Sequence, residues 1–143
     1  MNPKRLVLAI VVVFVGIFAT DFLIHGVWLK SDYTTTMSLW RPQSEMQQHM
    51  GWLMLGELLA TVTFTLIYAK GFAGTACIRC AGLYGFFMGL FSQATTFSSY
   101  AVQPIPGSLA AKWIVAGIVQ GVLMGLLVFF VYKPKPPAPE QGA

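Results

Sequence analysis

The stretch LVLAIVVVFVGIFATDFLIHGVWL, residues 6–29, is apolar along nearly its whole length. A helix rises about 1.5 Å per residue, so this stretch is long enough to cross the ~30 Å hydrocarbon core of a bilayer. The apolar run continues well past Ala19 and shows no A-x-A cleavage pattern, so we expect a retained span rather than a signal peptide. Because lipid cannot satisfy an exposed sheet edge, the stretch predicts an all-α membrane fold.

The composition of the whole chain agrees with this interpretation. Of its 143 residues, 56% are hydrophobic and only 10% are charged, with a mean hydropathy of +0.67. A soluble domain has about a quarter charged residues. The net charge of +4 comes from basic residues scattered at loop ends. This distribution indicates contact with the lipid bilayer and predicts no nucleic-acid partner.

Three further apolar runs follow the first. We expect four spans, at about residues 6–29, 48–69, 75–98 and 108–132, in one up-down-up-down bundle over residues 1–132. Ser44 and Gln47 have the spacing of a capping box, which predicts the start of the second helix. The Pro-rich segment 133–143 predicts a disordered tail on the cytoplasmic side.

The distribution of Lys and Arg predicts the orientation of the spans. Six such residues lie on one side of the predicted bundle: Lys4, Arg5, Lys70, Arg79, Lys133 and Lys135. Three lie on the other: Lys30, Arg41 and Lys112. The excess predicts that both termini are cytoplasmic, in a bacterial inner membrane. All four tryptophans map to the opposite interface, where amphipathic rings anchor well.

Polar residues recur at one depth in the predicted spans. Asp21 lies about 14 Å below the outer surface and Glu57 about 12 Å, as counted from the flanking loops along regular helices. His25 lies nearer that surface, and Gln93 and Gln120 lie at a comparable or greater depth. Each charge facing lipid would cost ~2.5–3.5 kcal/mol. We therefore predict a polar cluster in the outer half, in which one carboxyl group keeps a proton or His25 is charged.

The sequence leaves the role of this cluster open. The polar groups are expected either to hold the helices together or to bind a small ligand. A metal site is a second hypothesis, with ligands suited to zinc or non-haem iron from Asp21, His25, His49 and Glu57. Copper is a variant, with thioethers from Met46, Met50 and Met54 beside His49. Haem on His25 and His49, and a proton or solute pathway in an oligomer, are further hypotheses.

Glycines recur at four-residue spacing in the last two predicted spans. Such spacing places them on one helix face and lets another backbone approach closely. The predicted packing residues are Gly85, Gly89, Gly117, Gly121 and Gly125. They predict tight pairing, either between these two spans or with another protein.

Cys77 and Cys80 have the spacing of a redox C-x-x-C motif. The predicted topology places them at the cytoplasmic start of the third span, where thiols stay reduced, and the chain has no second pair to relay electrons. We therefore interpret them as two small residues at a helix start.

The arrangement Asp21-x3-His25-Gly26-x-Trp28-x4-Tyr33 resembles small bacterial four-helix integral membrane proteins of unknown function. The resemblance implies the fold and no activity. With no catalytic motif in the chain, the leading hypothesis is a non-enzymatic accessory or assembly subunit. It would form a homo-oligomer or join a larger membrane complex through its glycine faces. The alternative is a metal- or cofactor-binding protein that uses the polar cluster.

Overall fold

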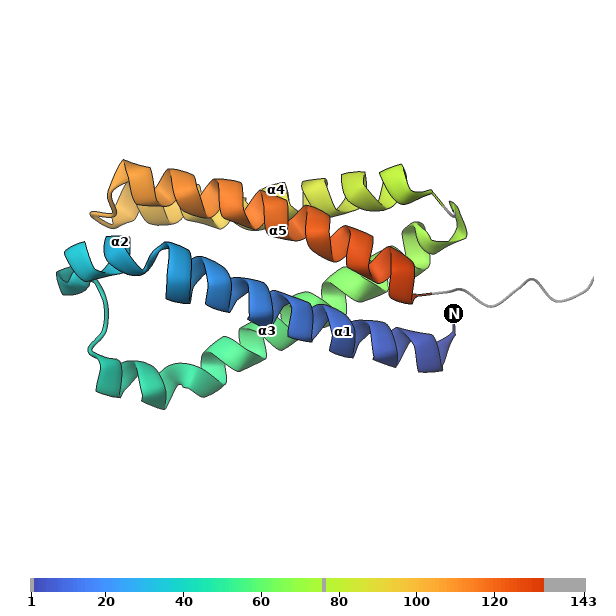
Figure 1. Cartoon of the computed structure of the whole chain (residues 1–143), viewed down its shortest axis with the longest axis horizontal. Coiled ribbons are helices and arrows are strands. Elements are labelled where there is room, and N and C mark those ends of the chain that lie inside the picture. The colour runs from blue at the N-terminus through green and yellow to red at the C-terminus, as the bar shows by residue number, and fades with distance from the viewer. Residues whose placement is uncertain (1, 76, 133–143) are drawn as a thin grey trace, which may run out of the picture.

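The structure is a computed structural model that describes residues 2–75 and 77–132. The described residues form helices and turns with no strand among them, which confirms the predicted all-α class. The four long helices are α1 (Pro3–Asp21), α3 (Gln43–Gly71), α4 (Ile78–Val102) and α5 (Gly107–Val131) (Figure 1). Shorter elements are the π-helix η1 (Phe22–Trp28), α2 (Lys30–Thr35) and the 3-10 turns η2 (Met37–Leu39) and η3 (Ala73–Thr75). The predicted tail, 133–143, lies outside the described residues.

Three helical segments among the described residues are long and apolar enough to cross a membrane. They are Pro3–Trp28, Gln43–Gly71 and Gly107–Val131, which correspond to the first, second and fourth predicted spans. They indicate a membrane protein. At 25 residues α4 has sufficient length, but it is not among the three. Arg79 and the hydroxyl and amide side chains between Ser92 and Tyr100 lower its mean hydropathy.

Helices α4 and α5 form a tightly packed antiparallel pair (Figure 1). A Cβ atom added at Gly89 would lie 2.9 Å from the carbonyl oxygen of Gly117, and one at Gly121 would lie 2.8 Å from the Cα of Gly89. Real side chains do not approach backbone so closely, so only glycine permits this separation of the two helices. All five predicted packing glycines, Gly85, Gly89, Gly117, Gly121 and Gly125, face the partner helix of this pair.

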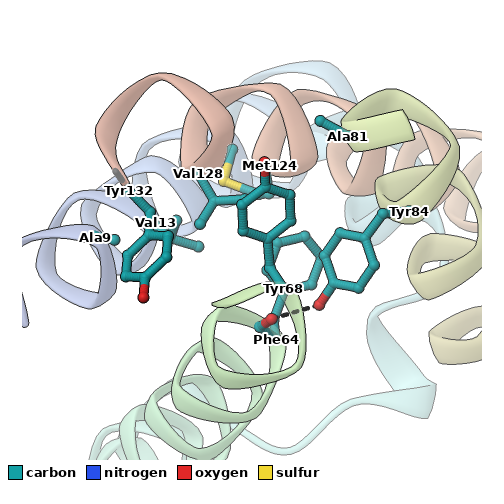
Figure 2. Packing of buried hydrophobic residues seen from close by; sticks show 9 residues of the cluster. All are labelled: Ala9, Val13, Phe64, Tyr68, Ala81, Tyr84, Met124, Val128 and Tyr132. Carbon is teal, nitrogen blue, oxygen red and sulfur yellow. Dashed lines mark hydrogen bonds between the residues drawn. The ribbon is translucent and has the colours of Figure 1, made fainter. Parts of the chain in front are cut away.

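The two ends of the described chain meet at one end of the molecule, here called the terminal end. The Asn2 N–H donates to the Tyr132 hydroxyl oxygen at 3.3 Å. Beside them, side chains from all four long helices form the terminal core, which Figure 2 shows. Its buried members are Ala9, Val13, Phe64, Tyr68, Ala81, Tyr84, Met124, Val128 and Tyr132. Within it, the Tyr84 hydroxyl donates to the carbonyl oxygen of Phe64 and joins α4 to α3 (Figure 2).

The opposite end, here called the distal end, is closed by α2. This short helix lies over the start of α5, held by two hydrogen bonds of 2.8 and 2.9 Å from the Lys112 ammonium group to the Asp32 carboxylate. Beneath them a second apolar cluster buries Leu29, Ile105, Leu109 and Ala110. The rings of Tyr33, Trp40 and Trp113 pack against it, with centroid separations of 5.6–6.4 Å between them.

Helix α3 is attached to the rest of the molecule mainly through its second half. Its buried residues are Thr61, Phe64, Thr65 and Tyr68, whereas residues 43–53 are exposed on every side. Figure 1 shows the first half of α3 diverging from the other long helices. The helix begins at Gln43, and its N-cap is Pro42 with no side-chain hydrogen bond, so the predicted capping box is wrong. Ser44 and Gln47 both lie inside the helix.

Candidate functional site

A partly open pocket of about 580 Å³ lies among the four long helices. Its polar lining residues are Asp21, His25, Glu57, Thr63, Ser92, Gln93 and Gln120. Its apolar lining residues are Ile17, Leu59, Ala60, Phe64, Met88, Phe91 and Met124, together with Gly89, Gly117 and Gly121. We call this cavity the polar pocket. Leu59 and Phe91 stand at its rim, with 59% and 77% of their surface exposed.

The structure brings the five residues of the predicted polar cluster into this one pocket. Asp21 is the last residue of α1, and His25 lies within η1. Glu57 comes from α3, Gln93 from α4 and Gln120 from α5. Every long helix therefore contributes a polar side chain to the pocket.

Asp21 is held in place by the amide of Gln120. The Nε2 group of Gln120 donates to the Asp21 carboxylate at 2.7 Å and to the Thr20 hydroxyl oxygen at 2.8 Å. These hydrogen bonds join α1 to α5. The Asp21 carboxylate lines the same pocket as His25 and Glu57.

The π-helical segment η1 determines the position of His25. A π-helix forms i→i+5 hydrogen bonds, of which the Leu29 N–H to the Ile24 carbonyl at 2.8 Å is one. The wider turn of a π-helix changes the direction in which its side chains point, compared with a regular α-helix. Such insertions often occur at functional sites. Asp21 is the last α-helical residue before the insertion, and His25 lies in its middle.

His25 is linked to the distal end by a chain of hydrogen bonds. Its Nδ1 atom lies 2.6 Å from the Tyr33 hydroxyl oxygen, which also accepts a hydrogen bond of 2.8 Å from Trp113 Nε1. An indole N–H can only donate, so the Tyr33 hydroxyl keeps its own proton to donate, and a neutral His25 ring accepts it at Nδ1. Burial is the main cause that raises the pKa of Tyr33, so the hydroxyl keeps this proton. The neutral His25 ring then carries its own proton on Nε2.

The remaining polar residues of the pocket differ in how they are satisfied. The Thr96 hydroxyl donates to the Gln93 side-chain oxygen at 2.8 Å, and Gln93 lies over the backbone of Gly117. Among the described residues, none donates a hydrogen bond to the Glu57 carboxylate, although Glu57 is partly buried. Glu57 is therefore the acidic group of the pocket that is most available to a ligand.

The predicted metal ligands are not all brought together. His49 is outside the polar pocket, and its Nδ1 lies 2.8 Å from the Glu45 carbonyl oxygen on the exposed half of α3. In residues 2–75 and 77–132, no group of three or more His, Cys, Asp or Glu residues is arranged to hold a metal ion. Met46 and Met50, named for copper, are 42% and 48% exposed beside His49. With His49 outside the pocket, the haem hypothesis also lacks its second ligand there.

The two cysteines lie at the start of α4, both as thiols. Cys77 is the N-cap residue, and its Sγ accepts the Cys80 backbone N–H at 3.1 Å. The side-chain hydrogen bond from Cys80 is the main cause that lowers the pKa of Cys77, with the backbone N–H of Cys80 next. The pair is remote in sequence and in the structure from the polar pocket, whose lining it does not join.

Two parts of the site were missed by the sequence interpretation. Tyr33 was named only as part of the arrangement that carries the resemblance, yet its hydroxyl lies 2.6 Å from His25 Nδ1, eight residues away in sequence. Met88, Phe91 and Met124 form apolar walls, and nothing separates such residues from ordinary lipid-facing ones in a sequence. A Tyr two turns after a His at a span end was the only available signal.

The chain matches no protein-family model, no curated protein and no solved structure.

Proposed function

We propose that this is a four-span protein of the bacterial inner membrane that binds a small ligand in the polar pocket. The observation that carries the proposal is the convergence of polar side chains from all four long helices on one partly open cavity. Ligand sites in helical bundles have this composition, in which apolar walls bury the ligand and a few polar groups orient it. The pocket opens toward the outer half of the membrane, and both termini are cytoplasmic.

Three features support α4 as a further membrane span, the third in chain order, with this orientation. It packs along α5, so a bilayer that contains α5 also surrounds α4. Asn2 and Tyr132 meet at one end, which requires an even number of crossings. The described basic residues of the terminal end, Lys4, Arg5, Lys70 and Arg79, outnumber those of the distal end, Lys30, Arg41 and Lys112.

The other hypotheses have less support. The glycine faces on which the accessory-subunit hypothesis depends contact each other between α4 and α5, so they offer no free surface to a partner. An oligomer or larger complex would need another interface. A continuous proton or solute pathway would have to pass the terminal core, where Phe64, Tyr68 and Tyr84 are buried together (Figure 2).

Native mass spectrometry of the full chain, purified in mild detergent from its own membrane, tests the proposal. We expect a small-molecule adduct on the monomer. Ala60 lines the pocket from the exposed side of α3, so Ala60→Trp fills the cavity without displacing a buried side chain. This variant should lose most of the adduct.

Leu58→Trp is the matched control, since Leu58 lies on the same helix, is 44% exposed and does not line the pocket. It should keep the adduct. An equal adduct on Ala60→Trp would contradict the proposal. Extra mass from other protein chains, with no small ligand, would favour the accessory-subunit hypothesis instead.

A further inference from the structure

The polar pocket has an excess of negative groups. Its lining includes the carboxyl groups of Asp21 and Glu57, and no Lys or Arg appears among its described lining residues. Of the basic side chains at the distal end, Lys112 binds Asp32 and Arg41 lies 3.6 Å from Glu45, while Lys30 does not line the pocket. Positive charge to balance the pocket must therefore come from His25, from protons or from the ligand.

The hydrogen bonds of His25 argue against His25 as the source. Its Nδ1 lies 2.6 Å from the Tyr33 hydroxyl oxygen, and Tyr33 itself accepts the Trp113 N–H. A charged imidazolium would donate from both ring nitrogens. The Tyr33 proton would then lose the only acceptor that the described residues give it. The network therefore fits a neutral ring that donates from Nε2.

The walls of the pocket favour an organic ligand over a bare inorganic ion. Ile17, Leu59, Met88, Phe91 and Met124 are apolar or weakly polar, and the described residues hold no metal-binding group of three acidic, His or Cys side chains. Aromatic faces attract organic cations, whose charge is spread over carbon-bound groups, and thioethers give adaptable apolar contacts. Phe91, Met88 and Met124 line the same pocket as the two carboxyl groups.

We infer that the polar pocket binds a lipophilic organic cation, a substituted amine or a quaternary centre. Its positive centre lies at Asp21 and Glu57, and its apolar groups lie against Met88, Phe91 and Met124. This inference rests on the proposed function, for which it names the class of ligand. Asp21 is already bound to Gln120, so Glu57 supplies the main counter-charge. The exposed rim at Leu59 and Phe91 admits the cation from the lipid.

Three probes of similar shape and different charge test the inference. The purified full chain in detergent is titrated with tetraphenylphosphonium, with tetraphenylborate and with neutral triphenylphosphine oxide. We expect saturable binding of the cation at one per chain and at least about ten-fold weaker binding of the other two. Glu57→Gln removes the charge and keeps the shape, so it should weaken cation binding by at least about ten-fold.

Glu45→Gln is the matched control. Glu45 is an exposed acid on the same helix that pairs with Arg41 outside the pocket, so its loss should leave cation binding unchanged. The retention time on size exclusion and the unfolding temperature show that each variant is folded.

Protons should compete with the cation for the same carboxyl groups. The titratable groups that face Glu57 are Asp21 from α1 and His25 from η1, while α4 and α5 contribute only uncharged Ser92, Gln93 and Gln120. Affinity for tetraphenylphosphonium should therefore fall as the pH falls, and Glu57→Gln should flatten this dependence.

The outcomes separate the inference from the function on which it rests. If the anion or the neutral probe binds as well as the cation, and Ala60→Trp blocks that binding, the ligand class is overturned and the pocket remains a binding site. If Ala60→Trp and Leu58→Trp bind every probe as the native chain does, the proposed function itself is contradicted. Absence of saturable cation binding, or a Glu57→Gln variant with native affinity, also overturns the inference.

Discussion

Single side chains in this protein have properties that follow from their place at a helix end. Cys77 precedes α4 and accepts the Cys80 N–H as its N-cap residue. Thiol groups at helix N-termini are stabilised as thiolates by the helix dipole and by such hydrogen bonds. Asp21 is stabilised in a different way, because it is the last residue of α1 and its carboxylate accepts a hydrogen bond from Gln120 inside the bundle.

We expect Cys77 to be alkylated faster than an ordinary thiol at neutral pH. Its pKa is lowered mainly by the side chain of Cys80, so a larger fraction is thiolate at any pH below the usual value. The rate of iodoacetamide modification, followed by peptide mass spectrometry, should rise with pH with a midpoint below that of an ordinary cysteine thiol. Cys80→Ala should move that midpoint upward. The same midpoint of the modification rate in the native chain and in the chain unfolded by a denaturing detergent would contradict the expectation.

At the scale of elements, the α4–α5 pair is the most tightly determined contact in the molecule. The glycines of α4 lie against the backbone of α5, so the two helices approach more closely than any side chain would allow. The contact runs along both helices and supplies two walls of the polar pocket through Gly89, Gly117 and Gly121.

Gly121→Ala should destabilise the protein by about 1–3 kcal/mol, the usual cost of overpacking. The added methyl group would meet the Gly89 backbone at 2.8–2.9 Å, and backbone cannot move aside as a side chain can. Thermal unfolding in detergent measures the effect. Gly51→Ala is the control, because nothing lies within 4 Å of its added Cβ. Equal unfolding temperatures for both variants would show that the close approach is not needed.

Sequence alone could predict the depth of the polar residues and not their direction. Asp21 and Glu57 were assigned to one level because the rise of a helix is constant. The direction of His25 depends on the π-helical turn at Phe22–Trp28, and no residue pattern in that segment predicts the insertion. The sequence therefore predicted that the polar residues share one depth, but only the structure shows that they line one pocket.

The glycine spacing shows a similar division. It predicted a close approach of two backbones, because Gly is the residue that such an approach requires, but it could not name the partner. The predicted start of α3 was wrong for a different reason. A capping box needs Ser44 outside the helix, whereas Pro42 already ends the extended segment and the helix begins one residue later.

For the whole molecule, the number of membrane crossings is the main structural question. Composition identifies three candidate spans, and α4 has polar residues that lower its hydropathy. Those residues include Ser92 and Gln93, which face the polar pocket rather than lipid. A helix whose polar groups line a cavity can be a span that hydropathy alone overlooks.

We expect a membrane-impermeant maleimide to label Cys77 only from the cytoplasmic side. In a background in which both native cysteines are Ser, Ser38→Cys and Gln103→Cys should be labelled only from the opposite side. Both positions are exposed, and they lie between the predicted spans at the distal end. Labelling of Gln103→Cys from the same side as Cys77 would mean that α4 does not cross the membrane.

The one-sided attachment of α3 has a mechanical consequence. Its buried residues lie between Thr61 and Tyr68, so its first half has few contacts that would oppose a change of tilt. The tilt of a span responds to the thickness of the surrounding bilayer, because an apolar stretch that is too long for the hydrocarbon leans over. In a thicker bilayer α3 would tilt less, and Glu57 would move toward α4 and α5. The width of the polar pocket would then depend on the thickness of the surrounding bilayer.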